Sequence, residues 1–412
     1  MADVFILEEL DDSSNQNITQ YIQIAHDPFI NTFIETGETS PDPREIGAPI
    51  LVMEITDNNG KNVIGKDIAE RVDSKLSSYK VTGNISTDTS GILTRIFLNN
   101  IMVSKGNDPS EVVEVADDTV GMLKWMSRTL NDNLMYRMGD LRLNSEHGRN
   151  GIWARTYVSE LNNDSAYMGR EINQNLFGGQ LGFDKKFQKD NSTIFAGLFV
   201  DYLNSDNGYF SGTGKTQNIG LAAYGSWLSN AGHYVDVTAR ASKIDGKFDI
   251  TNANGENITA DYDTWGMALS AEYGYRINTP NSWIIEPQAQ FTYNSLSGMN
   301  YDLSNGVNVE YGSIDSAIGR IGVNVGREFV KANLTAGLFY FHDFAGATEM
   351  TATADADSFE SKVNVVSDWY RLNVGTTLNL SDSSTLYLDL ARLFGGNVNN
   401  NWLLNAGVRC EF

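Results

Sequence analysis

Apolar and polar residues alternate one by one along the last segment of the chain, Trp402 to Phe412. The apolar face of this segment consists of Trp402, Leu404, Ala406, Val408, Cys410 and Phe412. A period of two is typical of a β-strand that separates two environments. A strand that ends at a free terminus frays unless it is tied down. We therefore predict that this strand closes a membrane β-barrel, with lipid outside and a polar lumen inside.

The same alternation recurs through the preceding sequence. Between Thr264 and Ile277, aromatic and aliphatic residues occupy every second position, and small or charged residues lie between them. The pattern predicts twelve strands, over residues 152–161, 175–188, 192–203, 216–228, 233–245, 264–277, 285–293, 318–329, 333–344, 368–380, 384–394 and 402–412.

The predicted connections between these strands are alternately short and long. Long polar loops are predicted over residues 162–174, 204–215, 246–261, 297–317 and 345–367. Short turns on one side and long loops on the other are typical of an outer-membrane barrel. The alternative, a soluble β-sandwich, does not produce this asymmetry so regularly.

One segment before the barrel has a helical period. Apolar residues recur at every fourth position, at Met122, Met126, Leu130, Leu134 and Met138. This stripe predicts a helix over 118–138, with Asp117 and Asp118 as its N-terminal cap. An amphipathic helix on some surface is one interpretation. Its length favours another, because 21 residues span ~30 Å, about the thickness of the hydrocarbon core, so we predict a helix inside the barrel.

Residues 1–116 differ from the barrel region, since their strand-like runs lack its long alternation. We predict an extramembrane region over 1–116, an acidic linker over 104–118 that leads to the pore helix within 117–143, and the barrel over 144–412. The first ten residues, MADVFILEEL, lack the basic and apolar stretches of a signal peptide. We therefore expect the chain to be the C-terminal part of a longer precursor.

Composition and charge exclude several classes of function. The chain contains 30 Lys and Arg against 52 Asp and Glu, a net charge of −22, whereas nucleic-acid binding needs clustered cations. Its single cysteine, Cys410, excludes an internal disulfide and a multi-cysteine metal site. We predict no metal and no cofactor. The sequence contains no apolar run of about 18 residues, the length that a transmembrane helix needs.

An outer-membrane hydrolase is an alternative that the sequence disfavours. His342 and Asp343 are adjacent, but neighbouring residues of a strand point to opposite faces and cannot form a dyad. The sequence contains neither a lipase-like serine motif nor a histidine pair with metal-ligand spacing. Charged residues predicted to face the lumen or its helix are Arg155, Glu272, Arg276, Glu286, Arg320 and Arg409. Of these, Arg155, Glu286 and Arg320 are predicted to contact the helix.

Several of these segments resemble the autotransporter translocator domain of type V secretion. The similarity covers about 117–412 and rests on RMGDLR (137–142), GIWAR (151–155), GGQLGFDKKF (178–187), WIIEPQAQFTY (283–293), GRIGVNVGREF (319–329) and the terminal phenylalanine. It implies a monomeric twelve-stranded barrel in the bacterial outer membrane, with a helix in its pore and its own passenger at the cell surface. It also implies that periplasmic chaperones and the barrel-assembly machinery handle the chain, with the apolar face of the last strand as the assembly signal. Part of 1–116 is similar to the end of a passenger β-helix.

The resemblance also bears on processing. In one branch of the family an asparagine inside the pore helix attacks its own carbonyl and releases the passenger. When RMGDLR is aligned, the family's paired asparagines fall on Asp132 and Asn133, and Asn131 lies one residue away. Because Asp132 lacks the amide nitrogen, we predict that residues 1–116 stay joined to the barrel. A small outer-membrane adhesin or structural surface protein, with 1–116 as its active part, is the remaining alternative.

Overall fold

The computed structural model describes residues 44–46, 50–55, 67–90, 93–143, 150–164, 171–345, 347–355, 357–363, 368–395 and 398–412. The chain divides into two compact units, each described below by itself. The first comprises Met1–Val113, Thr251–Ile258 and Thr353–Phe359. The second comprises Glu114–Ile250, Thr259–Ala352 and Glu360–Phe412.

The first unit is an antiparallel sheet. Its strands are β1 (Arg44–Ile46), β2 (Ile50–Ile55), β3 (Asp67–Asp73), β4 (Ser77–Ser90) and β5 (Leu93–Pro109). They are arranged in the order β1-β5-β4-β3, with β2 also paired to β5. The pairing in this sheet is antiparallel, whereas the coils of a β-helix pair in parallel. The similarity of this region to the end of a passenger β-helix therefore stays a prediction.

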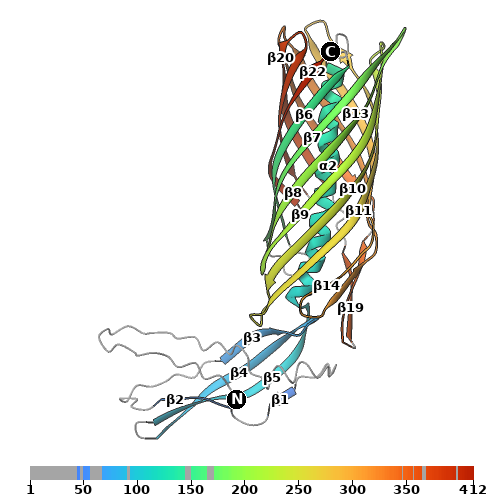
Figure 1. The fold of residues 1–412 in the computed structure, drawn as a ribbon. Helices are drawn as coiled ribbons and strands as arrows, with labels where there is room; N and C mark the ends of the chain where they lie inside the picture. The colour runs from blue at the N-terminus through green and yellow to red at the C-terminus, as the bar shows by residue number, and fades with distance from the viewer. Residues whose placement is uncertain are drawn as a thin grey trace, which may run out of the picture. The chain divides into compact units, whose positions relative to one another are not determined.

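The second unit is built around twelve long antiparallel strands, which confirms the predicted number. They are β6 (Gly151–Asp164), β7 (Glu171–Lys189), β8 (Ser192–Tyr209), β9 (Gly212–Ser229), β10 (His233–Thr251), β11 (Asn257–Tyr275), β13 (Trp283–Leu296), β16 (Ile314–Glu328), β17 (Ala332–Asp343), β20 (Asp368–Ser381), β21 (Ser384–Phe394) and β22 (Val398–Glu411). The two-residue strand β12 (Ile277–Asn278) pairs with β13. Pairing of β11 with β13 and of β22 with β6 closes the ring, so the last strand is the closing strand, as predicted (Figure 1).

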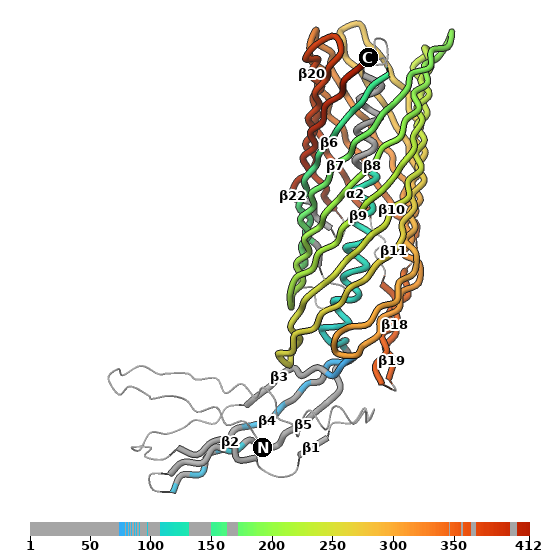
Figure 2. The backbone as a smooth tube through the Cα atoms, viewed as in Figure 1, coloured from blue at the N-terminus to red at the C-terminus, as the bar shows by residue number. Residues whose placement is uncertain are grey.

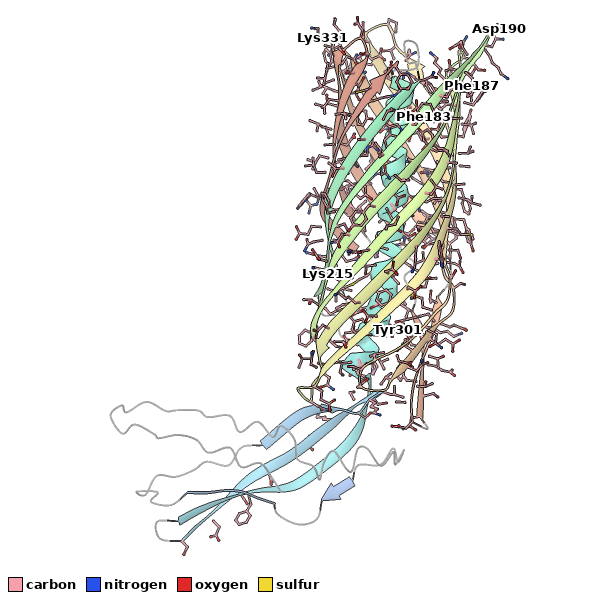
Figure 3. The ribbon with its side chains drawn as sticks, in the orientation of Figure 1. Phe183, Phe187, Asp190, Lys215, Tyr301 and Lys331 are labelled. Carbon is pink, nitrogen blue, oxygen red and sulfur yellow. The ribbon has the colours of Figure 1, made fainter. Side chains whose placement is uncertain are left out.

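The barrel is apolar outside and polar inside. On β11 the outward side chains of Trp265 and Leu269 are 60% and 56% exposed, whereas the inward side chains of Thr264 and Glu272 are buried. Side chains project outward over the whole length of the barrel (Figure 3). This arrangement is the reverse of a soluble sheet and requires lipid around the barrel.

Several neighbouring strands, β8 to β11 among them, continue beyond the apolar band. On β11 the outward residues from Asn257 to Asp263 are polar, and the apolar residues run from Trp265 to Tyr275. That apolar stretch corresponds to a band about 26 Å high, at ~3.4 Å per residue and a tilt of ~40°. We call the end with these extensions the long-strand end, and the opposite end, with turns such as 190–191 and 382–383, the short-turn end (Figure 2).

The predicted long loops are therefore wrong in several places. Residues 204–215 and 246–261 lie mostly in strands, because inward residues such as Tyr209 and Phe248 stay apolar while outward ones become polar. Within 297–317 and 345–367, a four-stranded sheet forms in the order β14 (Met299–Asp302), β15 (Asn308–Tyr311), β18 (Thr348–Ala354) and β19 (Asp357–Val363). A polar outward face does not by itself distinguish a loop from a strand that continues beyond the lipid.

Glycines on the inward face make room for aromatic rings from the neighbouring strand. A Cβ on Gly182 would lie 2.4 Å from the ring of Trp153, and one on Gly274 would lie 2.2 Å from Tyr234. Real Cβ atoms do not approach other atoms this closely, so a larger residue at either position would displace the ring. The glycines thus explain how large rings fit the inner wall.

The helix α2 (Glu111–Leu143) begins seven residues earlier than predicted. The predicted acidic linker over 104–118 is instead the end of β5 and the first turns of this helix. Ser110, rather than Asp117 or Asp118, is the cap, because its hydroxyl accepts a hydrogen bond from the Val113 amide at 3.5 Å. The acidic residues of this segment follow the cap, where the helix dipole favours negative charge. Among the described residues no helix is both long enough and apolar enough to cross a membrane.

Candidate functional site

The barrel lumen is occupied by α2, which runs inside the ring of strands (Figures 1 and 2). Every side chain of the helix from Glu114 to Leu130 is buried. Polar side chains of the wall reach the helix from β7, β8, β13, β15 and β17. The predicted pore helix is therefore confirmed, and its contacts with the wall form the candidate site.

A buried ion pair holds the middle of the helix. The guanidinium of Arg128 donates to the carboxylate of Asp343 at the end of β17, and both side chains are almost fully buried. Asp343 Oδ1 also accepts hydrogen bonds from the amides of Ala317 and Ala345, at 2.9 and 3.0 Å. Backbone amides of the wall thus hold this carboxylate in position opposite the cation of the helix.

The same arginine is packed between two indole rings. Its guanidinium carbon lies 4.4 Å from the ring centroid of Trp125 and 4.8 Å from that of Trp369, which belongs to β20. The two rings meet edge to face at 5.4 Å. Cation–π contacts of this kind strengthen when they are shielded from water, so Arg128 joins the helix to two strands at once.

Two amide side chains add anchors on other parts of the helix. Asn131 Nδ2 donates to the Ser127 carbonyl at 3.0 Å and to Asn294 Oδ1 on β13. Gln174 Nε2 on β7 donates to the carbonyl of Met122 at 3.2 Å. The helix is therefore tied to opposite parts of the wall by hydrogen bonds as well as by charge.

A tyrosine cluster lies against the helix at the long-strand end and consists of Tyr209, Tyr262, Tyr301 and Tyr311. The hydroxyl of Tyr311 donates to the carbonyl of Ala116 at 2.7 Å, and the hydroxyls of Tyr209 and Thr119 are 3.0 Å apart. Burial raises the pKa of the Tyr311 hydroxyl well above its ordinary value. This hydroxyl therefore stays protonated and able to donate over the physiological pH range.

Of the predicted lumen charges, five are buried on the inner wall: Arg155, Glu272, Glu286, Arg320 and Arg409. Arg320 donates to Glu272 at 2.6 Å and to Gln288 at 3.3 Å. It also lines a cavity of about 10 Å³ together with Arg128 and Asn131 of the helix, room for roughly one water. Arg276 instead pairs with Glu328 at 2.5 Å near the short-turn end.

The remaining lumen predictions stay predictions. Arg155 is buried, and its guanidinium carbon lies 5.2 Å from the ring centroid of Tyr387. Glu286 is buried on β13. The helix side chains beyond Asn131 lie outside the described ones, and these include Asp132 and Asn133 of the proposed cleavage position.

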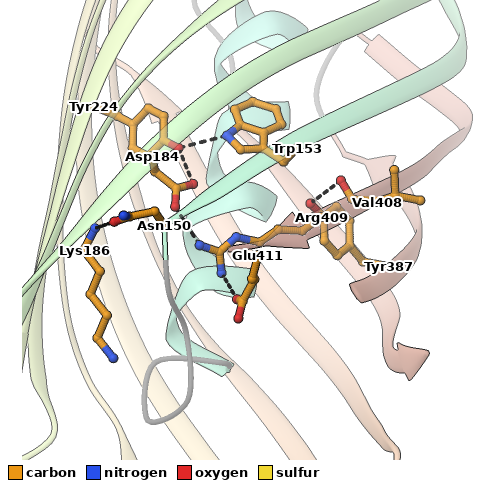
Figure 4. Close-up of polar contacts among 9 residues, drawn as sticks. All are labelled: Asn150, Trp153, Asp184, Lys186, Tyr224, Tyr387, Val408, Arg409 and Glu411. Atoms are coloured by element: carbon orange, nitrogen blue, oxygen red, sulfur yellow. Dashed lines mark hydrogen bonds and ion pairs between the residues drawn. The ribbon is translucent and has the colours of Figure 1, made fainter. Parts of the chain in front are cut away.

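A second ion-pair network joins the closing strand to β6, β7 and β9 (Figure 4). Arg409 on β22 donates to Asp184 on β7 at 2.6 Å and also pairs with Glu411. The Tyr224 hydroxyl donates to Asp184 at 2.9 Å, and Trp153 Nε1 donates to that hydroxyl at 2.9 Å. The sequence predicts that Arg409 faces inward, but its partner Asp184 is 225 residues away and becomes visible only once the ring is closed.

The outward face of β22 carries the residues of the predicted assembly signal. Trp402, Leu404, Val408, Cys410 and Phe412 are exposed on the lipid side, and Ala406 is partly exposed. The Phe412 amide donates to the carbonyl of Asn150 at 3.0 Å. The terminus is thus held by the residue that precedes β6, and the role of these residues in assembly stays a prediction.

The adjacent His342 and Asp343 point to opposite faces of β17. His342 Nδ1 lies 2.7 Å from Asp368 Oδ1 in a partly exposed pair, whereas Asp343 faces the lumen and holds Arg128. The two residues therefore do not form a catalytic dyad, in agreement with the sequence argument.

Comparisons with known proteins agree with this architecture. A sequence model described as "Autotransporter beta-domain" matches residues 152–391, more than half of the chain. The BrkA autotransporter of Bordetella pertussis is 29% identical over 282 residues, which are 67% of this chain and 27% of that protein. The serine protease sat autotransporter of Escherichia coli is 31% identical over 289 residues, 68% of this chain and 22% of that protein. The chain thus spans about a third or less of the length of these relatives.

Solved structures show the same fold. The β domain of the Bordetella autotransporter BrkA aligns over 64% of this chain and 100% of its own, with a TM-score of 0.53 and 25% identity. The translocator domain of NalP from Neisseria meningitidis aligns over 69% and 97%, with a TM-score of 0.54 and 16% identity. A closed twelve-stranded barrel with a helix in its lumen, together with a matching family model, places the protein in the bacterial outer membrane. The chain belongs to the autotransporter β-domain family.

Proposed function

We propose that this barrel exports the chain's own N-terminal region and keeps it at the cell surface with α2 as an uncut tether. The observation that carries the proposal is the helix itself, which is continuous from Glu111 to Leu143 within the barrel. Its first turns lie at the long-strand end, among the tyrosine cluster. In outer-membrane barrels the longer connections face the cell exterior, so the N-terminal side of the helix faces outward.

The polar contacts of the helix support retention rather than release. Arg128, Asn131 and the backbone of Ala116 are each held by a different strand of the second unit. The amide of Asn131 is occupied by the Ser127 carbonyl and by Asn294. An amide that donates two hydrogen bonds is constrained against attack on a backbone carbonyl.

We further propose that the barrel is not itself an enzyme and acts as a monomer. Some relatives carry the word protease in their names, but the part that this chain shares with them is the barrel. The barrel-assembly machinery and periplasmic chaperones are its proposed partners during biogenesis. The proposed role of the terminal strand is to be read by that machinery.

Removal of Phe412 tests export and assembly together. With an epitope placed before Arg44, we expect antibody to label intact cells that carry the complete chain. Deletion of Phe412 should lower surface labelling severalfold, because the terminal ring is 62% exposed and stacks on Phe183 at 6.3 Å on the lipid side. Barrels that do insert should keep nearly the same heat stability, since the deletion removes one backbone hydrogen bond, to Asn150, and no register pair with β6.

The matched control is the loss of an equally exposed aromatic ring elsewhere. Phe344→Ala removes a ring that is 65% exposed at the other end of the barrel and should leave labelling near the level of the unchanged chain. Labelling that appears only after cells are permeabilised would refute export. Equal labelling with and without Phe412 would refute the proposed role of this residue in assembly.

A further inference from the structure

A cationic and aromatic row lies at the short-turn end of the barrel. Arg327 on β16 is directly opposite Trp283 on β13 in the strand register. Its guanidinium carbon lies 5.3 Å from the Trp283 ring centroid and 5.4 Å from that of Phe329. All three side chains are exposed on the outside of the barrel, so this cation is held between two rings where the apolar band ends.

Three other cations have a similar position. Lys331 lies in the turn after β16, and Lys189 ends β7. Lys185 Nζ lies 5.3 Å from the ring centroid of Phe187. Phe187 and Lys331 mark two different sides of this end in Figure 3. We call Lys185, Lys189, Arg327 and Lys331 the basic rim.

The basic rim differs from several cations at the long-strand end in its pairing, although the exposed Lys247 and Arg392 near that end are also without an ion pair among the described residues. Within the part of the chain that the structure describes, none of its four members forms an ion pair. Lys215, Lys243 and Lys362 at the other end each pair with an aspartate or glutamate. The rim charges are therefore available to an external anion, although the whole chain carries a net charge of −22.

The acidic residues near the rim do not cancel this charge. Glu328 is paired with Arg276 at 2.5 Å. The exposed carboxylates of Asp190 and Asp382 lie in turns of the same end, and Asp190 directly follows Lys189. With the C-terminal carboxylate of Phe412, three exposed carboxylates lie at this end against the four rim cations, so the cations are in slight excess.

The rim is also continuous with the lipid-facing surface. Val330, in the turn after β16, is 97% exposed, and Leu380, near the end of β20, is 63% exposed. The Asn379 amide donates to the Lys331 carbonyl at 3.0 Å, which ties the turn after β16 to β20. Exposed apolar side chains beside unpaired cations are typical of a surface that lies at the boundary between acyl chains and headgroups.

We propose that the basic rim binds the phosphate groups of anionic phospholipids in the periplasmic leaflet of the outer membrane. The short-turn end faces that leaflet. Lysine and arginine near a membrane surface attract anionic lipid, and aromatic rings settle at the level of the headgroups. Zwitterionic lipid offers the same acyl chains but no net charge, so the rim should select lipid by charge.

Native mass spectrometry of the complete chain in mixed micelles tests this proposal. With equal amounts of phosphatidylglycerol and phosphatidylcholine, we expect the bound lipid to be mainly phosphatidylglycerol. The exposed double variant Arg327→Gln/Lys331→Gln should weaken phosphatidylglycerol binding by about fivefold for each cation removed. The matched control, Lys215→Gln/Lys243→Gln, removes the same charge at the other end and should leave the preference unchanged.

Several outcomes would overturn the proposal. Equal occupancy by the two lipids would do so, as would an undiminished preference in the rim variant or an equal loss in the control variant. Competition by inorganic phosphate without any lipid preference would show a general anion site instead. Heat-dependent migration on gels checks that each variant is folded. If the double variant fails to fold, the single variant Lys331→Gln, at a fully external position, replaces it in the same measurement.

Discussion

A chain that begins at Asn150, and so lacks α2, is expected to conduct ions on the order of tenfold better than the complete chain in planar bilayers. A helix with side chains is ~10–12 Å wide, and the wall packs against it on several sides. Without the helix this cross-section is available to water and ions. Single-channel current at fixed voltage measures the difference.

Two controls make this result interpretable. The shortened barrel must shift its gel mobility on heating, as a folded barrel does. A chain that keeps α2 but begins at Arg44 should conduct as poorly as the complete chain. Equal conductance with and without the helix would mean that wall residues such as the tyrosine cluster close the lumen by themselves.

Asp343→Asn is expected to destabilise the folded barrel by about 3–5 kcal/mol, the usual consequence of removing one partner of a buried ion pair. The substitution keeps an oxygen that can accept from the amides of Ala317 and Ala345 and removes only the charge opposite Arg128. The heat or denaturant midpoint of the folded-to-unfolded gel shift measures the loss.

Asp368→Asn is the matched control, because Asp368 is also a strand-end aspartate but pairs with His342 at a partly exposed position. Exposed pairs contribute less than ~1 kcal/mol, so its midpoint should barely move. If the two variants shift the midpoint equally, Arg128 does not anchor the helix. Adding Arg128→Met to Asp343→Asn should restore part of the stability, since no buried charge is then left.

The barrel could be predicted from sequence because alternate residues of each spanning strand face lipid and the polar lumen, and their polarity differs accordingly. Trp265 and Leu269 are outward and Glu272 is inward, as the pattern predicts. The pattern failed where lipid ends but the strand continues. Beyond Trp265 the outward residues of β11 are polar, so the extension to Asn257 has the composition of a loop.

The contacts between the helix and the wall were much harder to predict. Arg128 and Asp343 are 215 residues apart, and Asn131 and Asn294 are 163 apart. To predict these pairs, one must know the shear of the closed ring and the rotation of the helix inside it. Neither follows from local periodicity. The start of the helix is hard to predict for a different reason. The segment from Glu111 to Asp118 is acidic enough to resemble a solvated linker, although Ser110 caps the helix that begins there.

The central claim is that a continuous helix inside the barrel tethers an exported N-terminal region. Protease treatment of intact cells, followed by intact-mass measurement of the fragment left in the outer membrane, tests it most directly. We expect one protected fragment that ends at Phe412 and begins upstream of Glu114, and untreated membranes should contain residues 1–116 in the same chain. A new N-terminus within 131–134 before treatment, or full protection of 1–116 in intact cells, would contradict the account.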